Sequence, residues 1–186
     1  MKQTVTVAAL MALAACSGPA KEGSTTDDPL DTGPPGVEPL ADVYINEFMA
    51  SNTMTHPDES GAFPDWVELY NASDFEADLS GWWLTDDNTN VFKWQIPDGV
   101  TIPAGGFWVV FCDSDVEQGD NHASFQLDAA GEDLGLYGPN VRDNPEIDAI
   151  DAYGQQLPDV SLARSPDGSP TFVADDTPTP GASNGG

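Results

Sequence analysis

Positive charge is scarce in this sequence. The 186 residues include five Lys and Arg against 32 Asp and Glu, which gives a formal net charge of -27. Phosphate backbones are polyanions, so this charge excludes nucleic acid from the expected partners, and an anionic lipid surface would repel the chain for the same reason. The excess of acid is typical of a well-solvated surface outside the cell and is compatible with divalent cations.

Aromatic residues are absent from the first 41 positions, and all 17 of them lie further along the chain. Large rings supply much of the apolar area that a core buries, so the folded domain is predicted to span residues 42–186. Residues 17–41 contain five Pro, four Gly and five Ser or Thr. Such a segment cannot bury enough surface to offset its ordering entropy, so it is predicted to be a disordered tether that spans roughly 25–30 Å.

Residues 1–15 have the layout of a signal peptide. Lys2 supplies the positive end, and the apolar run at 5–15 is too short to span a bilayer. The run ends in the sequence LAAC, which resembles the bacterial lipobox, where small residues precede an invariant Cys. The resemblance implies cleavage before Cys16 and lipid attachment to it, and chains of this kind together anchor a protein durably. An ordinary secretory signal with a chance Cys is the alternative.

The residue after Cys16 bears on location. In the best-known sorting rule an Asp at this position retains a lipoprotein at the inner membrane, so Ser17 indicates the outer membrane or cell surface. Lipid attachment would consume Cys16 and leave Cys112 without a disulfide partner, although the compartment is oxidising. Because Cys112 ends the apolar run FWVVFC, it is predicted to be a buried, unreactive thiol.

From residue 42 the sequence consists of short runs rich in Val, Ile, Phe, Trp and Tyr, separated by Pro, Gly, Asn and Asp. Each run is typical of a strand, and none has a long helical period. Nine strands are predicted, at 43–48, 65–71, 81–86, 92–96, 106–112, 124–127, 133–138, 147–153 and, more weakly, 161–164. Eight to nine short strands in one domain predict an all-β, antiparallel, immunoglobulin-like β-sandwich.

Alternation along a strand assigns side chains to faces. In DWVELYN (65–71), Val67 and Leu69 point one way, so Glu68 is predicted to face solvent between two outward rings, Trp66 and Tyr70. In VYINEF (43–48) the same rule places Glu47 on the apolar side. Either a β-bulge intervenes, or Glu47 is a partly buried carboxylate bonded to backbone N–H groups.

Seven segments occur in a definite order: INEFMASN (45–52), DWVELYN (65–71), LSGWWLTDD (79–87), KWQIPDGVTIPAGGFWVVF (93–111), HASFQL (122–127), SLARSPDG (161–168) and TPTPGASN (177–184). This series resembles the lamin tail domain family in its bacterial form, over about residues 42–184. The resemblance implies an immunoglobulin-like sandwich, in agreement with the strand count, and it implies no catalytic residues. It does not extend to filament assembly or nuclear partners, since heptad repeats, a basic nuclear signal and a prenylation motif are missing.

Catalysis would need other signals. A glycosidase-like pair of carboxylates would best be formed by Glu47 and Glu68, but their structural interpretation is a hydrogen-bonded acid and a surface acid. The letters GASNG (181–185) match a nucleophile elbow without its strand and helix. His56 and His122 are predicted to be surface residues in loops, and with Cys112 they would supply only three scattered zinc ligands.

Calcium is the metal that the sequence allows. Asp113, Asp115, Glu117 and Asp120 lie in one loop and alternate at first as in an EF-hand, but the required Gly and the bidentate Glu are missing. An irregular calcium site from these four residues is therefore a hypothesis, and a solvated acidic loop is the alternative. The segment TDDNTN (85–90) is a weaker candidate, with an Asx-rich turn as its alternative.

The sequence as a whole predicts an envelope lipoprotein without a cofactor. Cys16 anchors it, residues 16–41 space it from the membrane, and the domain acts without catalysis in adhesion, scaffolding or docking of an envelope or extracellular protein or polysaccharide. Two other functions stay open: a surface hydrolase or its accessory that uses carboxylates and a metal, and a calcium-stiffened spacer. Outward aromatics or an exposed strand edge would supply the contact.

Overall fold

The computed structural model describes residues 39–185, and within this range it contains strands and a single 3-10 turn. The predicted signal peptide, Cys16 and the tether lie outside the described residues. No helix within 39–185 is long and apolar enough to cross a membrane. The elements are β1 (Val43–Met49), β2 (Asp65–Asn71), β3 (Ala77–Asp78), β4 (Trp83–Thr85), β5 (Trp94–Gln95), β6 (Thr101–Ile102), β7 (Phe107–Cys112), β8 (His122–Ala123), β9 (Leu134–Tyr137), η1 (Asn140–Arg142), β10 (Glu146–Ile150), β11 (Ser161–Arg164) and β12 (Phe172–Asp175).

Eight of the nine predicted strands are confirmed to within a few residues, and one prediction is wrong. The segment 124–127 is not a strand, because only one isolated bridge, between Asp113 and Gln126, pairs its backbone. Phe125 and Leu127 in that segment are nevertheless buried. The alternation of apolar residues in this segment therefore reflects burial of their side chains and not strand pairing. The strand that does pair, β8, lies just before it. The prediction also missed β3, β6, β8 and β12, of which the first three have only two residues each.

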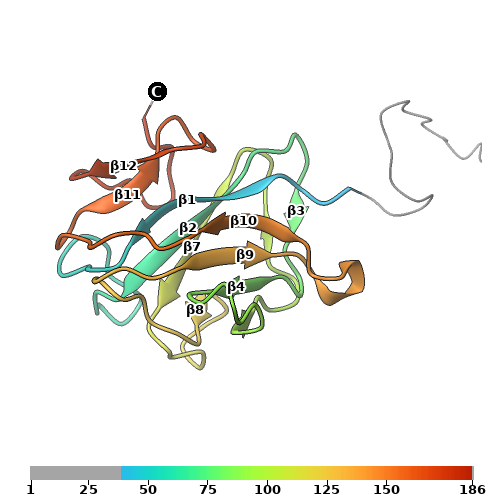
Figure 1. Ribbon diagram of the computed structural model, residues 1–186, viewed down its shortest axis with the longest axis horizontal. Helices are drawn as coiled ribbons and strands as arrows, with labels where there is room; N and C mark the ends of the chain where they lie inside the picture. Colours follow the sequence, from blue (N-terminus) through green and yellow to red (C-terminus); the bar gives the residue numbers. More distant parts are fainter. Residues whose placement is uncertain (1–38, 186) are drawn as a thin grey trace, which may run out of the picture. The chain divides into compact units, whose positions relative to one another are not determined.

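The strands form an immunoglobulin-like β-sandwich. A six-stranded sheet has the order β12-β11-β1-β2-β7-β8, and a four-stranded sheet has the order β10-β9-β4-β5. All pairings are antiparallel except that of β7 with β8, which is parallel. Figure 1 shows β10, β9 and β4 lying across β1, β2 and β7 as a second layer, with β12 at one edge of the first. β3 and β6 form a small, separate two-stranded sheet.

The main core lies between the two larger sheets. Ile45, Leu69 and Val110 enter it from the six-stranded sheet, and Leu84 and Leu136 enter it from the four-stranded sheet. All five are fully buried. Burial of a side chain of this size contributes about 1.5–3 kcal/mol, so contacts of this kind hold the two layers together.

A β-bulge in β1 changes which side chains face this core. Ile45 pairs with Leu69 and Glu47 pairs with Glu68, so Asn46 is one extra residue in β1. After the bulge the alternation is inverted, and Phe48 rather than Glu47 enters the core. The predicted bulge is therefore confirmed, and it turns Glu47 to the outer face of the six-stranded sheet.

Arg164 connects elements of both sheets. Its Nη2 bonds both carboxylate oxygens of Asp148 in β10, at 3.0 and 2.9 Å, and its Nε donates to the carbonyl oxygen of Ile45 at 2.8 Å. Asp148 in turn accepts the backbone N–H of Ile45 at 2.8 Å. The guanidinium lies 4.4 Å from the ring centroid of Phe172. The ion pair therefore satisfies both backbone groups of Ile45 on the edge of β1 that pairs with β11 only further along, at Glu47 and Phe48.

Replacing Arg164 is expected to destabilise the domain strongly. Arg164→Leu leaves the Asp148 carboxylate buried without its cation, and breaking such a pair costs about 3–5 kcal/mol. The measurement is urea unfolding followed by tryptophan fluorescence. The double variant Arg164→Leu, Asp148→Asn should lose less than the single variant, because no uncompensated charge remains. A single variant as stable as the wild type would contradict this role.

Candidate functional site

Two glutamates lie side by side on the outer face of the six-stranded sheet. Glu47 in β1 and Glu68 in β2 are direct cross-strand partners, and each is 0% exposed. The prediction that Glu68 faces solvent is wrong, and so is the prediction that Trp66 is an outward ring, since Trp66 is also 0% exposed. The alternation placed them on the correct side of β2, but later segments of the chain cover that side.

The cover over the glutamates is the C-terminal segment that follows β12, which donates backbone N–H groups to both. Glu47 accepts the N–H of Thr179 at 3.2 Å and the hydroxyl of Ser161 at 2.5 Å. Glu68 accepts the N–H of Gly181 at 2.6 Å and the side-chain amide of Asn46 at 3.0 Å. The prediction of a buried Glu47 bonded to a backbone N–H is thereby confirmed along with the bulge.

Residues 177–185, called the strap below, are fixed at their far end by Asn184. The side-chain amide of Asn184 donates to the carbonyl oxygens of Asn46 at 3.2 Å and Arg164 at 3.1 Å. Its backbone N–H donates to Asp167 at 2.9 Å, and Asp167 also accepts from Asn46 at 2.9 Å. The chain after Phe172 therefore packs on the domain.

Burial dominates the titration of both glutamates. It raises the pKa of Glu68 to about 7, against the lowering effect of the hydrogen bonds from Asn46 and Gly181, and the charges of Glu47 and Asp167 raise it further. Burial likewise raises the pKa of Glu47, although Ser161 and Thr179 lower it. The two carboxyl groups can retain a proton and can hold the strap by hydrogen bonds. Their oxygens already accept hydrogen bonds from donors of the same chain.

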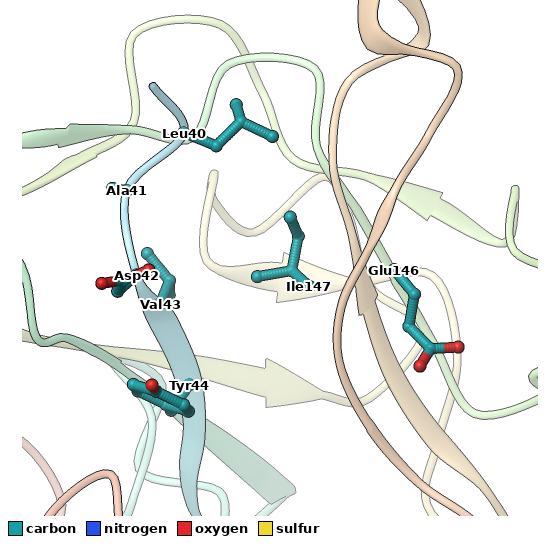
Figure 2. A pocket seen from close by; sticks show the side chains of 7 residues that line it. All are labelled: Leu40, Ala41, Asp42, Val43, Tyr44, Glu146 and Ile147. Atoms are coloured by element: carbon teal, nitrogen blue, oxygen red, sulfur yellow. The ribbon is translucent and has the colours of Figure 1, made fainter. Parts of the chain in front are cut away.

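A small hollow lies elsewhere on the described surface, between the start of β1 and β10. It has a volume of about 180 Å³ and is lined by Leu40, Ala41, Asp42, Val43, Tyr44, Glu146 and Ile147. Figure 2 shows Leu40 and Ile147 extending into it, with the carboxylates of Asp42 and Glu146 on opposite sides. Ligand pockets of about 300–1,000 Å³ are usual, so the hollow is small, and neither Glu47 nor Glu68 lines it.

His122 is buried, not at the surface as predicted. Its ring is 0% exposed, with Nδ1 2.8 Å from Asp113 Oδ2 and Nε2 3.2 Å from Glu59 Oε2. Burial alone would lower the pKa of His122, but the hydrogen bonds and charges of Asp113 and Glu59 outweigh it and raise the pKa above 6.5. The ring of Phe111 lies 5.2 Å away, centroid to centroid. His122 thus ties two acidic loops to β7.

This tie predicts a pH-dependent contribution to stability. Because the folded pKa of His122 is raised, the stabilisation is complete below 6.5 and is lost as pH rises through the folded value. Asp113→Asn should therefore lower the free energy of unfolding by about 1–3 kcal/mol at pH 5.5 and by less at pH 8.5. Urea midpoints at the two pH values measure this. The control is Glu117→Gln, which replaces an exposed acid of the same loop and should change the free energy of unfolding little at either pH. An equal loss of stability for Asp113→Asn at both pH values would contradict the assignment.

The four calcium candidates do not converge on one point. Asp113 bonds His122 and the backbone N–H of Asp115, while Asp115, Glu117 and Asp120 are exposed. Among residues 39–185 no group of three or more His, Cys, Asp or Glu side chains is placed to hold a metal ion. The trio of His56, His122 and Cys112 is therefore not placed to bind zinc. In the weaker candidate, 85–90, Asp87 bonds the N–H and hydroxyl of Thr89, as an Asx turn does.

The calcium hypothesis has a direct test. From this geometry we expect the melting temperature of the full chain to be the same in millimolar calcium as in chelator at equal ionic strength. A midpoint that rises steadily with calcium concentration would contradict this, because a ligand that binds only the folded form stabilises it by mass action. Asp115→Asn would then show whether the loop is the site.

Of the two cysteines, Cys112 lies among the described residues and Cys16 does not. Cys112 is buried and free, and burial raises the pKa of its thiol well above the usual value, so it is confirmed as an unreactive group. Cys16 lies outside the described residues, and its lipid attachment stays a prediction.

Comparison with known families agrees with the sandwich. Residues 37–156 match the family model described as Lamin Tail Domain. The chain belongs to the lamin tail domain family. No curated protein matches the chain. The lamin tail domain is an immunoglobulin-like binding or structural domain, so the family supports a non-catalytic role. The last two segments of the resemblance, 161–168 and 177–184, lie beyond the matched residues.

Sequence reasoning missed the polar residues that complete the site. Asn46, Asp167 and Asn184 join β1, the loop after β11 and the strap into one hydrogen-bonded unit. All three lie inside quoted segments of the lamin tail domain resemblance. The sequence signal was only that each of these segments contains small polar residues, and nothing in one sequence indicates that three distant segments meet.

Proposed function

We propose that the chain is an envelope lipoprotein that displays its lamin tail domain for docking, with Cys16 as the lipid-modified residue. The lipid anchor places it at the outer membrane or cell surface, and residues 17–41 act as a spacer. The domain contributes binding or scaffolding to an envelope or extracellular protein or polysaccharide, without catalysis. The single observation that carries the non-catalytic part is the use of Glu47 and Glu68, the best catalytic candidates, in holding the strap.

The anchor rests on the LAAC sequence that ends a short apolar run at Cys16. A run of that length suits a signal peptide and is too short for a membrane-spanning helix. The net charge of -27 repels anionic lipid, so a covalent lipid would hold the domain at a membrane that its own surface does not bind.

A strand edge supplies the contact surface in this proposal. Tyr70 is stacked with Phe107, at 5.0 Å between ring centroids, and Trp66 is buried, so the outward aromatics suggested by the sequence are mostly occupied. β12 forms one edge of the six-stranded sheet, and Val173 within it is 48% exposed. An edge strand offers unpaired backbone groups to an extended partner segment, which supports docking by strand addition.

The anchor is tested by metabolic labelling with an alkyne-bearing fatty acid in a bacterial host, followed by detergent phase separation. The wild type and the control Cys112→Ala are expected to be labelled and to enter the detergent phase, while Cys16→Ser should be unlabelled and stay in water. An unlabelled wild type, or label retained by Cys16→Ser, would contradict lipid attachment at Cys16. Residues 1–15 would then be explained as an ordinary secretory signal.

A further inference from the structure

Four carboxylates lie close together at the outer face of β1 and β2. Glu47 and Glu68 are paired at the centre, and the charges of Asp167 and Asp175 raise the pKa of Glu47. The guanidinium of Arg164 is engaged by Asp148 and by the carbonyl oxygens of Ile45 and Ser169. Hydrogen bonds from Ser161, Thr179, Asn46 and Gly181 hold Glu47 and Glu68.

The strap supplies most of the hydrogen bonds that these four carboxylates accept, including the N–H and hydroxyl that Thr177 donates to Asp175. Thr179 and Gly181 each give one backbone N–H to the glutamates, and Ser183 and Asn184 bond Asp167. The strap contains two Pro, which lack an N–H, and no large apolar side chain that would hold it by burial. Only Asn184 within it is buried, while Gly181, Ala182 and Ser183 are exposed. Apart from the hydrogen bonds that Asn184 makes with Asn46, Arg164 and Ser165, its attachment thus depends on the carboxylates beneath it.

We propose that Glu47 and Glu68 form a proton-dependent latch, which holds the strap on β1 and β2 while at least one of them is protonated and releases it when both are ionised. Like charges placed directly opposite each other on neighbouring strands repel, and a buried pair relieves this by retaining one proton. Opening of the strap admits water to both carboxylates and removes the need for that proton. The released state exposes the polar face of β1 and β2 while the main core, on the other side of the sheet, stays closed.

The linkage has a definite sign. The pKa of Glu68 is about 7 in the closed form, against an ordinary value of 4.5 when the carboxyl is exposed, so the closed form binds the proton more tightly. Stabilisation of the closed form is complete below the ordinary value and is lost as pH rises through the closed-form value. The opening equilibrium is expected to change on the order of a hundredfold over that range.

Hydrogen–deuterium exchange of the full chain between pH 5 and pH 8.5, corrected for intrinsic exchange rates, tests the latch. Peptides that cover the strap should lose about a hundredfold in protection over this range, while peptides that cover β2 and β7 should keep theirs. Glu68→Gln and Glu47→Gln imitate the protonated side chain, so their straps should stay protected at pH 8.5. Asp115→Asn, an exposed acid outside the latch, is the matched control and should behave as the wild type.

Three results would overturn the proposal. Strap protection that is constant from pH 5 to pH 8.5 would show that the glutamates do not govern it. Equal loss in the strap and in β2 and β7 would indicate general destabilisation of the fold. Glu→Gln variants that retain the wild-type pH dependence would assign the effect to other groups. Should the variants fail to fold, the wild-type comparison between strap and core peptides still decides between a latch and general loss of stability.

Discussion

A single extra residue in β1 determines how the outer face of the six-stranded sheet is built. Without the bulge at Asn46, strict alternation would direct Glu47 into the core occupied by Ile45 and Phe48. An ionised carboxylate in an apolar core costs far more than a single bulge, so the inversion is required by the sequence. The bulge then brings Glu47 opposite Glu68, and the strap, Asn46 and Asp167 are all arranged around that pair.

The shortage of cations explains why hydrogen bonds take the place of ion pairs across this domain. Asp159 is stabilised by the N–H groups of Thr53 and Met54 and by the hydroxyls of Thr53 and Thr55, which lower its pKa to about 2. Where such donors are plentiful the carboxylate stays charged, as at this exposed loop. Where burial dominates, as at Glu68, the pKa rises instead. Among the residues that the structure describes, Arg164 is the one buried Lys or Arg side chain.

The sequence was sufficient for the fold class because strand patterns are local. β2 was predicted with its bounds as observed, and alternation divided its side chains correctly between two faces. What the sequence did not reveal was which face would be covered later. Alternation in β2 alone directs Trp66 and Glu68 outward, whereas in the fold Trp66 packs with its cross-strand partners Met49 and Phe111, and the strap covers Glu68. His122 was misjudged in the same way, since its partner Glu59 is 63 residues away.

The residues after position 156 are an integral part of the folded domain and not an appendage to it. The family match ends there, yet β11 pairs with β1 on its second edge, Arg164 satisfies the backbone of Ile45, and the strap covers Glu47 and Glu68. Both glutamates and the donor Asn46 belong to the matched part, while their other hydrogen-bond donors, Ser161, Thr179 and Gly181, come from outside it. A carboxylate pair enclosed by the last segment of its own chain makes closure of the sandwich sensitive to how that segment is held. The same glutamates that look catalytic in the sequence therefore act, in the folded domain, on the chain itself.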